Sequence, residues 1–173
     1  MPNKSTGRYS VTQKYLMTRG QAINFPAQYF NTNFKRDEVY GVVIDIPMAA
    51  DVLTTMVCFI NGAANLYFNN GGEYSGASQK YRNLVQAAHN LVANAGQLVP
   101  KAVKTTKYDI PTGRTNYIFL LTRGGVYKAE IQAGLIPETE PEKRTIYVLY
   151  QRVLNELRNC QLRDDAEKRK AAK

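Results

Sequence analysis

The feature that most constrains the fold is a two-residue hydrophobic period between residues 40 and 68. YGVVIDIPM places Tyr40, Val42, Ile44 and Ile46 on one face of an extended segment, opposite Val43 and Asp45. The next run, VLTTMVCFI, is largely apolar on both faces and reads as a central strand. Asn61-Gly62 is then a strong hairpin signal, and ANLYFN returns as the third strand. The pattern predicts three consecutive antiparallel strands.

The period then changes to that of a helix. Apolar residues recur at helical spacing from Tyr81 to Leu98, and the opposite face is rich in amides and nearly uncharged. Residues 115–131 repeat the hairpin pattern around Arg123-Gly124-Gly125, and a final amphipathic helix is expected to start near residues 142–145. The order β-β-β-α-β-β-α predicts an α+β fold, with an antiparallel sheet of about five strands and helices packed on it.

The chain of 173 residues fits one domain. Residues 1–16 are polar and basic and are expected to form a flexible arm. Residues 17–162 are expected to form a single α+β domain, in which residues 17–36 are a short helical turn or an irregular covering segment. Residues 163–173 carry mixed charge and are expected to be a helical or frayed tail.

The charge and the cysteine content limit the expected partners and the expected cellular compartment. The net charge is +9, and residues 1–36 contain six basic residues and no acidic one, so contact with a polyanion is open. Cys58 and Cys160 have no second pair to make a disulfide framework, which favours free thiols in a reducing cytoplasm. No apolar run is long enough for a secretory signal or a bilayer span, so no membrane partner is expected.

A small-residue stretch, NNGGEYSGAS, stands before the first predicted helix, where phosphate-binding loops occur. It lacks the lysine of a P-loop, and its glycines give GGxxxG rather than GxGxxG. Gly71, Gly72, Ser75 and Gly76 remain candidates for a weak anion at the helix start. The preferred interpretation is a chain reversal, with Ser75 or Ser78 capping the helix.

The sequence contains no recognisable catalytic constellation. His89 is the single histidine and has no flanking nucleophile, and Cys58 lies among apolar neighbours where a thiol behaves as a small hydrophobe. Asp45 lies mid-strand without a partner acid. No group of oxygen or nitrogen ligands converges in the sequence. We therefore predict no catalytic residues, no cofactor and no metal site.

Nucleic-acid binding is the alternative that composition allows. Twelve tyrosines and 23 basic residues could supply base-stacking surfaces beside phosphate contacts. The candidates are the adjacent basic and aromatic residues Arg8-Tyr9, Lys14-Tyr15 and Lys107-Tyr108.

Between residues 38 and 160 the chain resembles an uncharacterised family of small bacterial proteins. The resemblance rests on GVVIDI, INGAANLYF, NNGGEYSG and the helix after it, and on PTGRTNYIFLLTRGGVYKAEI and TIYVLYQRVLNELR. Asn61 stands where Asp is usual in that family, and Asn70 and Glu73 interrupt a run that is often all glycine. The resemblance implies no known activity. The element order is also similar to that of the roadblock and profilin-like α+β folds, and roadblock members act as dimeric adaptors or GTPase regulators.

These observations predict a non-enzymatic, cytoplasmic interaction or adaptor module that self-associates through a sheet edge or a helix face. Its expected partners are proteins, including a second copy of the chain. A nucleic-acid-associated basic protein is the alternative.

Overall fold

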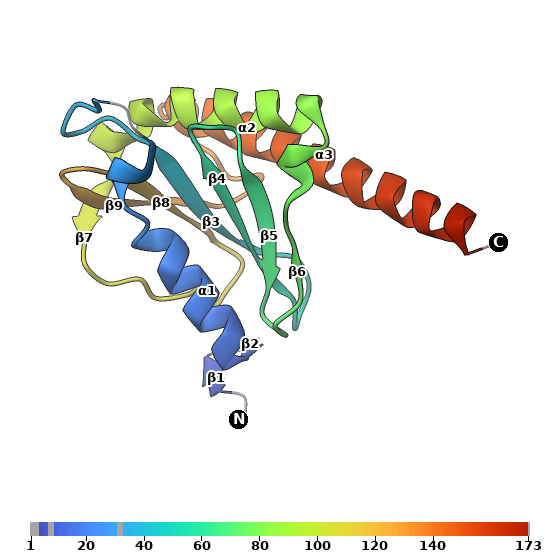
Figure 1. Cartoon of the computed structure of the whole chain (residues 1–173). Coiled ribbons are helices and arrows are strands. Elements are labelled where there is room, and N and C mark those ends of the chain that lie inside the picture. The colour runs from blue at the N-terminus through green and yellow to red at the C-terminus, as the bar shows by residue number, and fades with distance from the viewer. Residues whose placement is uncertain (1–3, 7–8, 31–32, 173) are drawn as a thin grey trace.

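The computed structural model describes residues 4–6, 9–30 and 33–172, which form an antiparallel sheet with two helices on one face and one on the other (Figure 1). The elements are β1 (Lys4–Thr6), β2 (Tyr9–Val11), α1 (Gln13–Ile23), η1 (Ala27–Phe30), β3 (Gly41–Pro47), β4 (Leu53–Phe59), β5 (Ala64–Phe68), β6 (Glu73–Tyr74), η2 (Ala77–Gln79), α2 (Arg82–Asn94), η3 (Ala95–Lys101), β7 (Val103–Thr105), β8 (Asn116–Thr122), β9 (Gly125–Ile131) and α3 (Pro141–Ala171).

The main sheet has seven strands in the order β6-β5-β4-β3-β8-β9-β7, and every pair in it is antiparallel. The α+β class is confirmed, but the expected count of about five strands is too low. The two missed strands are the edges, β6 and β7, of two and three residues. Strands this short show no periodicity of their own, because pairing with a neighbour is what makes them extended.

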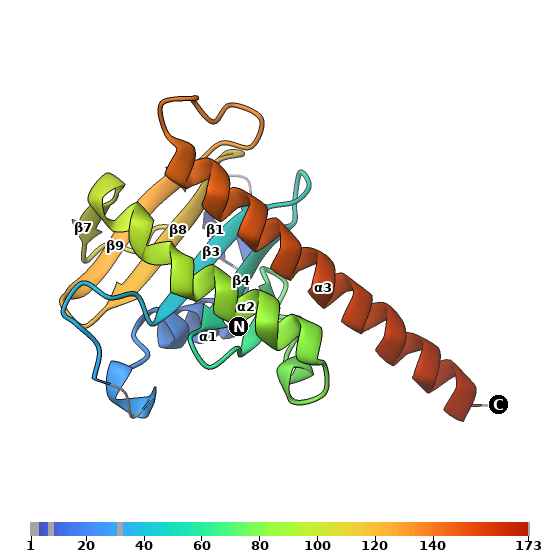
Figure 2. The same ribbon diagram turned by 90° about the horizontal axis from the view of Figure 1, so that it is seen from above.

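One face of the sheet packs against α2 and α3, which lie side by side over it (Figure 2). The alternation in β3 places Val42, Ile44 and Ile46 in this core, as expected. Tyr40, which precedes the strand and was expected on the same face, packs in the opposite core instead. The helices contribute apolar stripes at the predicted spacing: Leu84, Ala88, Leu91 and Val92 from α2, and Ile146, Tyr150, Val153, Leu154 and Leu157 from α3.

The opposite face of the sheet packs against α1 and the segment that follows it. Val43, Val57 and Phe119 of the sheet meet Ile23 of α1 in a second core. Phenylalanine and tyrosine rings extend this core at centroid distances of 4.9–6.5 Å; the rings are Phe25, Tyr29, Phe30, Phe34, Tyr40 and Phe59. Since both faces are covered, β3 and β4 are apolar on both sides, as their sequences indicate.

The Asn61-Gly62 hairpin between β4 and β5 is confirmed. Gly62 has φ +90°, a conformation that L side chains rarely adopt. A Cβ at this position would lie 2.4 Å from Cγ1 of Val85 on α2. The glycine therefore serves both the turn and the close approach of the helix to the hairpin.

The N-terminal segment differs from the expected arm. Residues 9–16 include β2 and the start of α1, and Tyr9, Val11 and Tyr15 are buried. The hydroxyl of Thr12 caps α1 by accepting a hydrogen bond from the Tyr15 amide. The helix was not predicted because a basic residue, Arg19, occupies its buried face and interrupts the apolar pattern.

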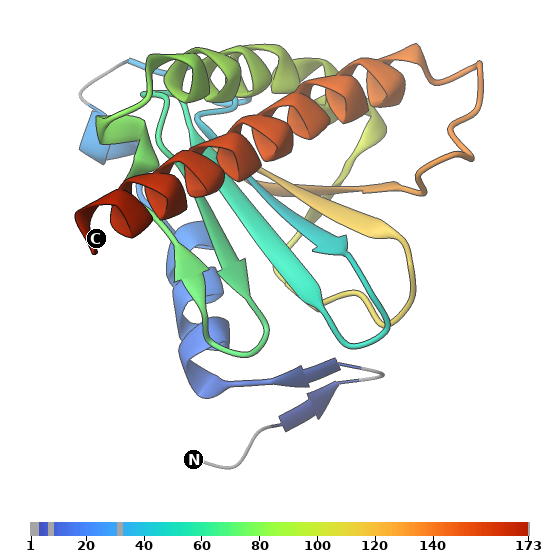
Figure 3. The ribbon, with the colours of Figure 1, turned by 90° about the vertical axis from the view of Figure 1, so that its right-hand side faces the viewer.

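Helix α3 extends well beyond the sheet. Its 31 residues correspond to a length of about 46 Å. The last buried residue is Cys160, and residues 161–171 project from the body (Figures 1 and 2). Figure 3 shows the molecule from the side toward which this end of α3 points. The charged segment expected to be a tail thus continues the last helix.

Candidate functional site

The glycine-rich stretch before α2 is a hairpin turn between β5 and β6, as predicted. Gly71 has φ +93°, and its amide donates to the Phe68 carbonyl at 2.9 Å. The Gly72 amide donates to the Asn70 side chain at 2.9 Å. Gly76 has φ +81°, and its amide donates to an asparagine side chain on β5 at 3.2 Å. These amides stabilise the chain reversal itself.

The predicted helix cap is wrong. The N-cap of α2 is Tyr81, which makes no side-chain cap bond. The hydroxyl of Ser78 instead donates to the Gly62 carbonyl at 2.9 Å and accepts from the Ala64 amide at 3.0 Å, so it fastens the neighbouring hairpin. Ser75 lines a groove beside α3. The short helix η2 follows Ser75 and contains Ser78, so neither serine lies at the start of α2, and the sequence pattern did not reveal this short helix.

The same stretch holds the long helix α3. The hydroxyls of Tyr74 and Tyr81 donate to the two carboxylate oxygens of Asp164 at 2.6 and 2.5 Å. Lys80 Nζ lies 3.2 Å from Asp164 and 2.6 Å from Glu167. We name these five residues the Asp164 clamp. It joins α3 to the segment between β5 and α2 just beyond the last buried residue of the helix.

Electrostatics in the clamp favour the ionised carboxylate. Hydrogen bonds from Tyr74 and Tyr81, with Lys80 nearby, lower the pKa of Asp164 to about 2. Burial and the hydrogen bond to Asp164 raise the pKa of the Tyr74 hydroxyl, so it remains a donor. Hydrogen bonds to Glu167 and Asp164 raise the pKa of Lys80.

Two hollows flank the clamp. The larger, of about 630 Å³, lies between the β6–η2 segment and the last turns of α3, and is lined by Glu73, Gly76, Asp165 and other residues of both segments. The smaller, of about 230 Å³, lies between the start of α2 and α3, and includes Arg82 and Arg163. Both are open to solvent, and charged side chains are among the residues that line each of them.

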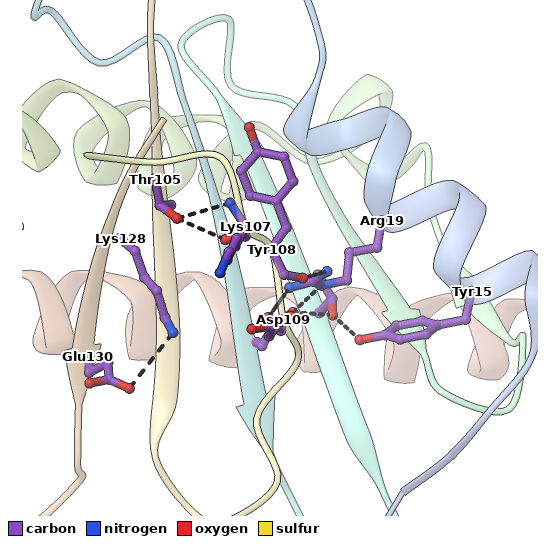
Figure 4. A network of polar contacts seen from close by, with 10 residues as sticks. Tyr15, Arg19, Thr105, Lys107, Tyr108, Asp109, Lys128 and Glu130 are labelled. Carbon is purple, nitrogen blue, oxygen red and sulfur yellow. Dashed lines mark hydrogen bonds and ion pairs between the residues drawn. The ribbon is translucent and has the colours of Figure 1, made fainter. Parts of the chain in front are cut away.

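A second polar network lies on the other side of the sheet, under α1 (Figure 4). Arg19 is 4% exposed and Asp45 is 0% exposed. The guanidinium donates to both oxygens of Asp45, at 3.0 and 2.7 Å, and to the carbonyls of Tyr108 and Asp109 at 2.7 and 3.3 Å. This bidentate pair joins α1, β3 and the loop before β8.

Two hydroxyls complete the network. Thr55 donates to Asp45 at 2.7 Å, and the hydroxyls of Tyr15 and Thr55 lie 2.5 Å apart. Burial, and then the neighbouring Asp45 carboxylate, raise the pKa of Tyr15. Sequence reasoning left Asp45 without a partner because Arg19 is 26 residues away in the chain. Since both carboxylate oxygens are hydrogen-bonded in a buried setting, the network serves to fix three segments together.

The surroundings of His89 and Cys58, the other side chains considered for catalysis, are those of structural residues. His89 is exposed, and its Nδ1 lies 2.8 Å from the Ile60 carbonyl oxygen. Cys58 is fully buried, and burial raises the pKa of its thiol. Within residues 4–6, 9–30 and 33–172, no three His, Cys, Asp or Glu side chains are grouped so that they could hold a metal ion.

The N-terminal nucleic-acid candidates do not form one surface. Arg8 lies outside the described residues. Tyr9 and Tyr15 are 0% and 1% exposed, so their rings present no face to a base. Lys14 is exposed, with Nζ 3.7 Å from Glu73. The tyrosines of this region belong to the core between α1 and the sheet.

The remaining candidate pair lies near the β7 edge. Lys107 is exposed, whereas Tyr108 is half-buried with its ring edge-on to Phe119. On β9, Lys128 Nζ lies over the Tyr117 ring at 3.6 Å and 3.9 Å from Glu130. Figure 4 shows Lys107 and Lys128 on this half of the sheet.

The sequence predicted only part of the outward surface of α2 and α3. The amide-rich side of α2 is exposed as the sequence indicates, but the arginines beside it on α3 were not recognised as part of the same surface. We name this surface the helix-layer face; its exposed residues are Arg82, Asn83, Gln86, Asn90, Asn94, Gln97, Arg144, Arg152, Asn155, Arg158, Asn159 and Arg163. Only the packing of the two helices side by side brings them together (Figure 2).

Comparisons of the chain with protein-family models, with curated proteins and with solved structures found no match. Over the described part of the chain, none of the helices combines the length and apolar character that crossing a membrane requires.

Proposed function

We propose that the protein is a non-enzymatic interaction module that associates with a second copy of itself through the projecting end of α3. The observation that carries this proposal is the length of the helix: residues 161–171 extend past the last buried residue, yet the Asp164 clamp holds their base on the domain. A short isolated helix is marginal in water, so an anchored and exposed one is suited to contact with another molecule.

Charges on the projecting end are self-complementary. Asp165 and Arg169 are exposed, and neither forms an ion pair with any described residue. In an antiparallel two-fold pairing, Asp165 of each copy would lie beside Arg169 of the other. Leu162, which is 63% exposed, would be covered by the same contact.

The other routes to self-association are less favourable. The sheet edges are only two and three residues long, and the longer one carries Lys104, which disfavours strand addition. The helix-layer face carries five exposed arginines, so two such faces would repel each other.

Light scattering coupled to size-exclusion chromatography tests the proposal. We expect the unmodified chain to be a dimer, D165R and R169D each to shift it toward monomer, and D165R/R169D to restore the dimer because the charges are exchanged. D37R changes an exposed charge on the loop before β3 and should have no effect. A monomeric unmodified chain at high concentration, or a double variant no better than the singles, would contradict the proposal.

The proposal extends to a cytoplasmic location, which two buried free thiols support. Kinship with the uncharacterised bacterial family, and a roadblock-like adaptor role, are retained as part of the proposal on the sequence resemblance alone.

A further inference from the structure

The helix-layer face carries positive charge that the protein does not neutralise. Arg82, Arg144, Arg152, Arg158 and Arg163 are all exposed, and none forms an ion pair within the described residues. Other cations of the chain, such as Arg19 and Lys80, are paired with carboxylates. The five arginines are therefore available to an external anion.

Acidic residues are few within the two helical segments that carry these arginines, and most of those of α3 lie toward its two ends. Residues 74–108, which contain all of α2, include no Asp or Glu. Between residues 143 and 163 of α3 there is one acid, Glu156, and it is half-buried. The helix-layer face thus sets five exposed arginines against one half-buried acid, and this local excess of positive charge attracts anions.

The side chains have the chemistry of phosphate recognition. Arginine presents a planar fork of donors that matches phosphate in a bidentate geometry. The exposed amides of α2, such as Asn90 and Asn94, can add hydrogen bonds to phosphate or sugar oxygens. Exposed tyrosine stacking surfaces are not part of the face, since the ring of Tyr81 is half-buried with Arg163 over it at 5.9 Å.

The dimensions favour a long ligand. From Arg144 to Arg163 the helix rises about 28 Å, and the hollow between the two helices is only about 230 Å³. A small anion would contact one or two of these arginines. A nucleic-acid duplex presents one phosphate per about 1.7 Å of its axis, so it could meet all of them without a fixed register.

We infer that the helix-layer face binds the phosphate backbone of double-stranded nucleic acid, independently of base sequence, through its exposed arginines and the amides of α2. This site differs from the basic and aromatic pairs of the N-terminal segment and the β7 edge. It also does not depend on self-association, because Asp165 and Arg169 are outside it.

Fluorescence anisotropy with labelled 20-base-pair DNA and RNA duplexes, at 50–200 mM salt, tests the inference. We expect about five phosphate contacts to give a plot of log K against log [salt] with a slope near −4.5. R152Q/R158Q should reduce the slope to about −2 or −3 and weaken binding roughly 10–100-fold at 0.1 M salt. Binding of either duplex supports the inference, and the comparison of the two identifies whether the face binds DNA, RNA or both.

The matched control is K104Q/K107Q, which removes the same charge from the β7 side of the sheet. It should leave the slope within about half a unit of the unmodified chain. Circular dichroism melts verify that both variants fold. The inference is overturned if neither duplex binds at 50 mM salt, if the two double variants lose affinity equally, or if a poly-glutamate 20-mer binds while neither duplex does; the last result would assign the face to an acidic protein.

Discussion

Replacing Arg19 with Met tests whether the buried network fixes α1 to the sheet. The substitution keeps a long unbranched side chain but removes four hydrogen bonds, two to Asp45 and two to carbonyls of the loop before β8. Asp45 then keeps only its bond from Thr55, although it is fully buried. A buried carboxylate without its cation is strongly destabilising.

The expected cost follows from this geometry. Breaking one partner of a buried ion pair typically lowers the free energy of unfolding by about 3–5 kcal/mol. For a chain of this length, 1 kcal/mol corresponds to about 2–4 °C in Tm, so we expect R19M to melt about 6–20 °C lower. R158M makes the same exchange at an exposed helical position and should change stability by about 0.5 kcal/mol or less.

Urea unfolding followed by circular dichroism measures the free energies, and a double-mutant cycle isolates the pair. R19M/D45L removes both charges, so it should be at least about 1 kcal/mol more stable than the sum of the single losses predicts. A loss below about 1 kcal/mol for R19M, or strict additivity in the cycle, would refute the view that this pair is a coupled structural element.

Three further predictions concern the clamp, a turn and the thiols. Because the pKa of Asp164 is lowered from 3.8 to about 2, the stabilisation it gives is present above about pH 4 and is lost as the pH falls through about 2; a carboxyl ¹³C titration with a midpoint near 4 would contradict this. Gly62→Ala should cost about 2–4 kcal/mol in urea unfolding, from positive φ and the clash with α2, whereas Gly96→Ala, with open space around it, should be neutral or slightly stabilising. Cys58 and Cys160 should react with a thiol reagent only on unfolding, since both are buried, and rapid labelling of the native protein would refute that placement.

The central strands and the helices α2 and α3 could be predicted because their buried side chains recur with the period of a strand or of a helix. In β3 the alternation decides which face each side chain meets, and the helical stripe from Tyr81 to Leu98 survives as the buried side of α2 and η3. The hairpin at Gly62 follows from backbone conformations that few residues adopt. Each of these choices depends on neighbours within a few positions in the chain.

Helix α1 and the candidate sites could not be predicted in the same way. Arg19 interrupts the apolar pattern of α1, and only the placement of Asp45 beneath it makes burial of this side chain favourable. The clamp likewise joins Tyr74 to Asp164, 90 positions later. A contact between residues so far apart in the chain produces no periodic pattern in the sequence around either residue, so the sequence gives no local sign of it.

Local sequence alone therefore determined the class of fold, the central strands and the apolar sides of the helices, since each depends on the repeat of a strand or a helix. Only the tertiary structure decided that the segment between β5 and α2 forms hydrogen bonds and ion pairs with α3, and that arginines from two helices share one surface. Those features depend on which distant segments lie against each other, which is set by the packing of the whole chain.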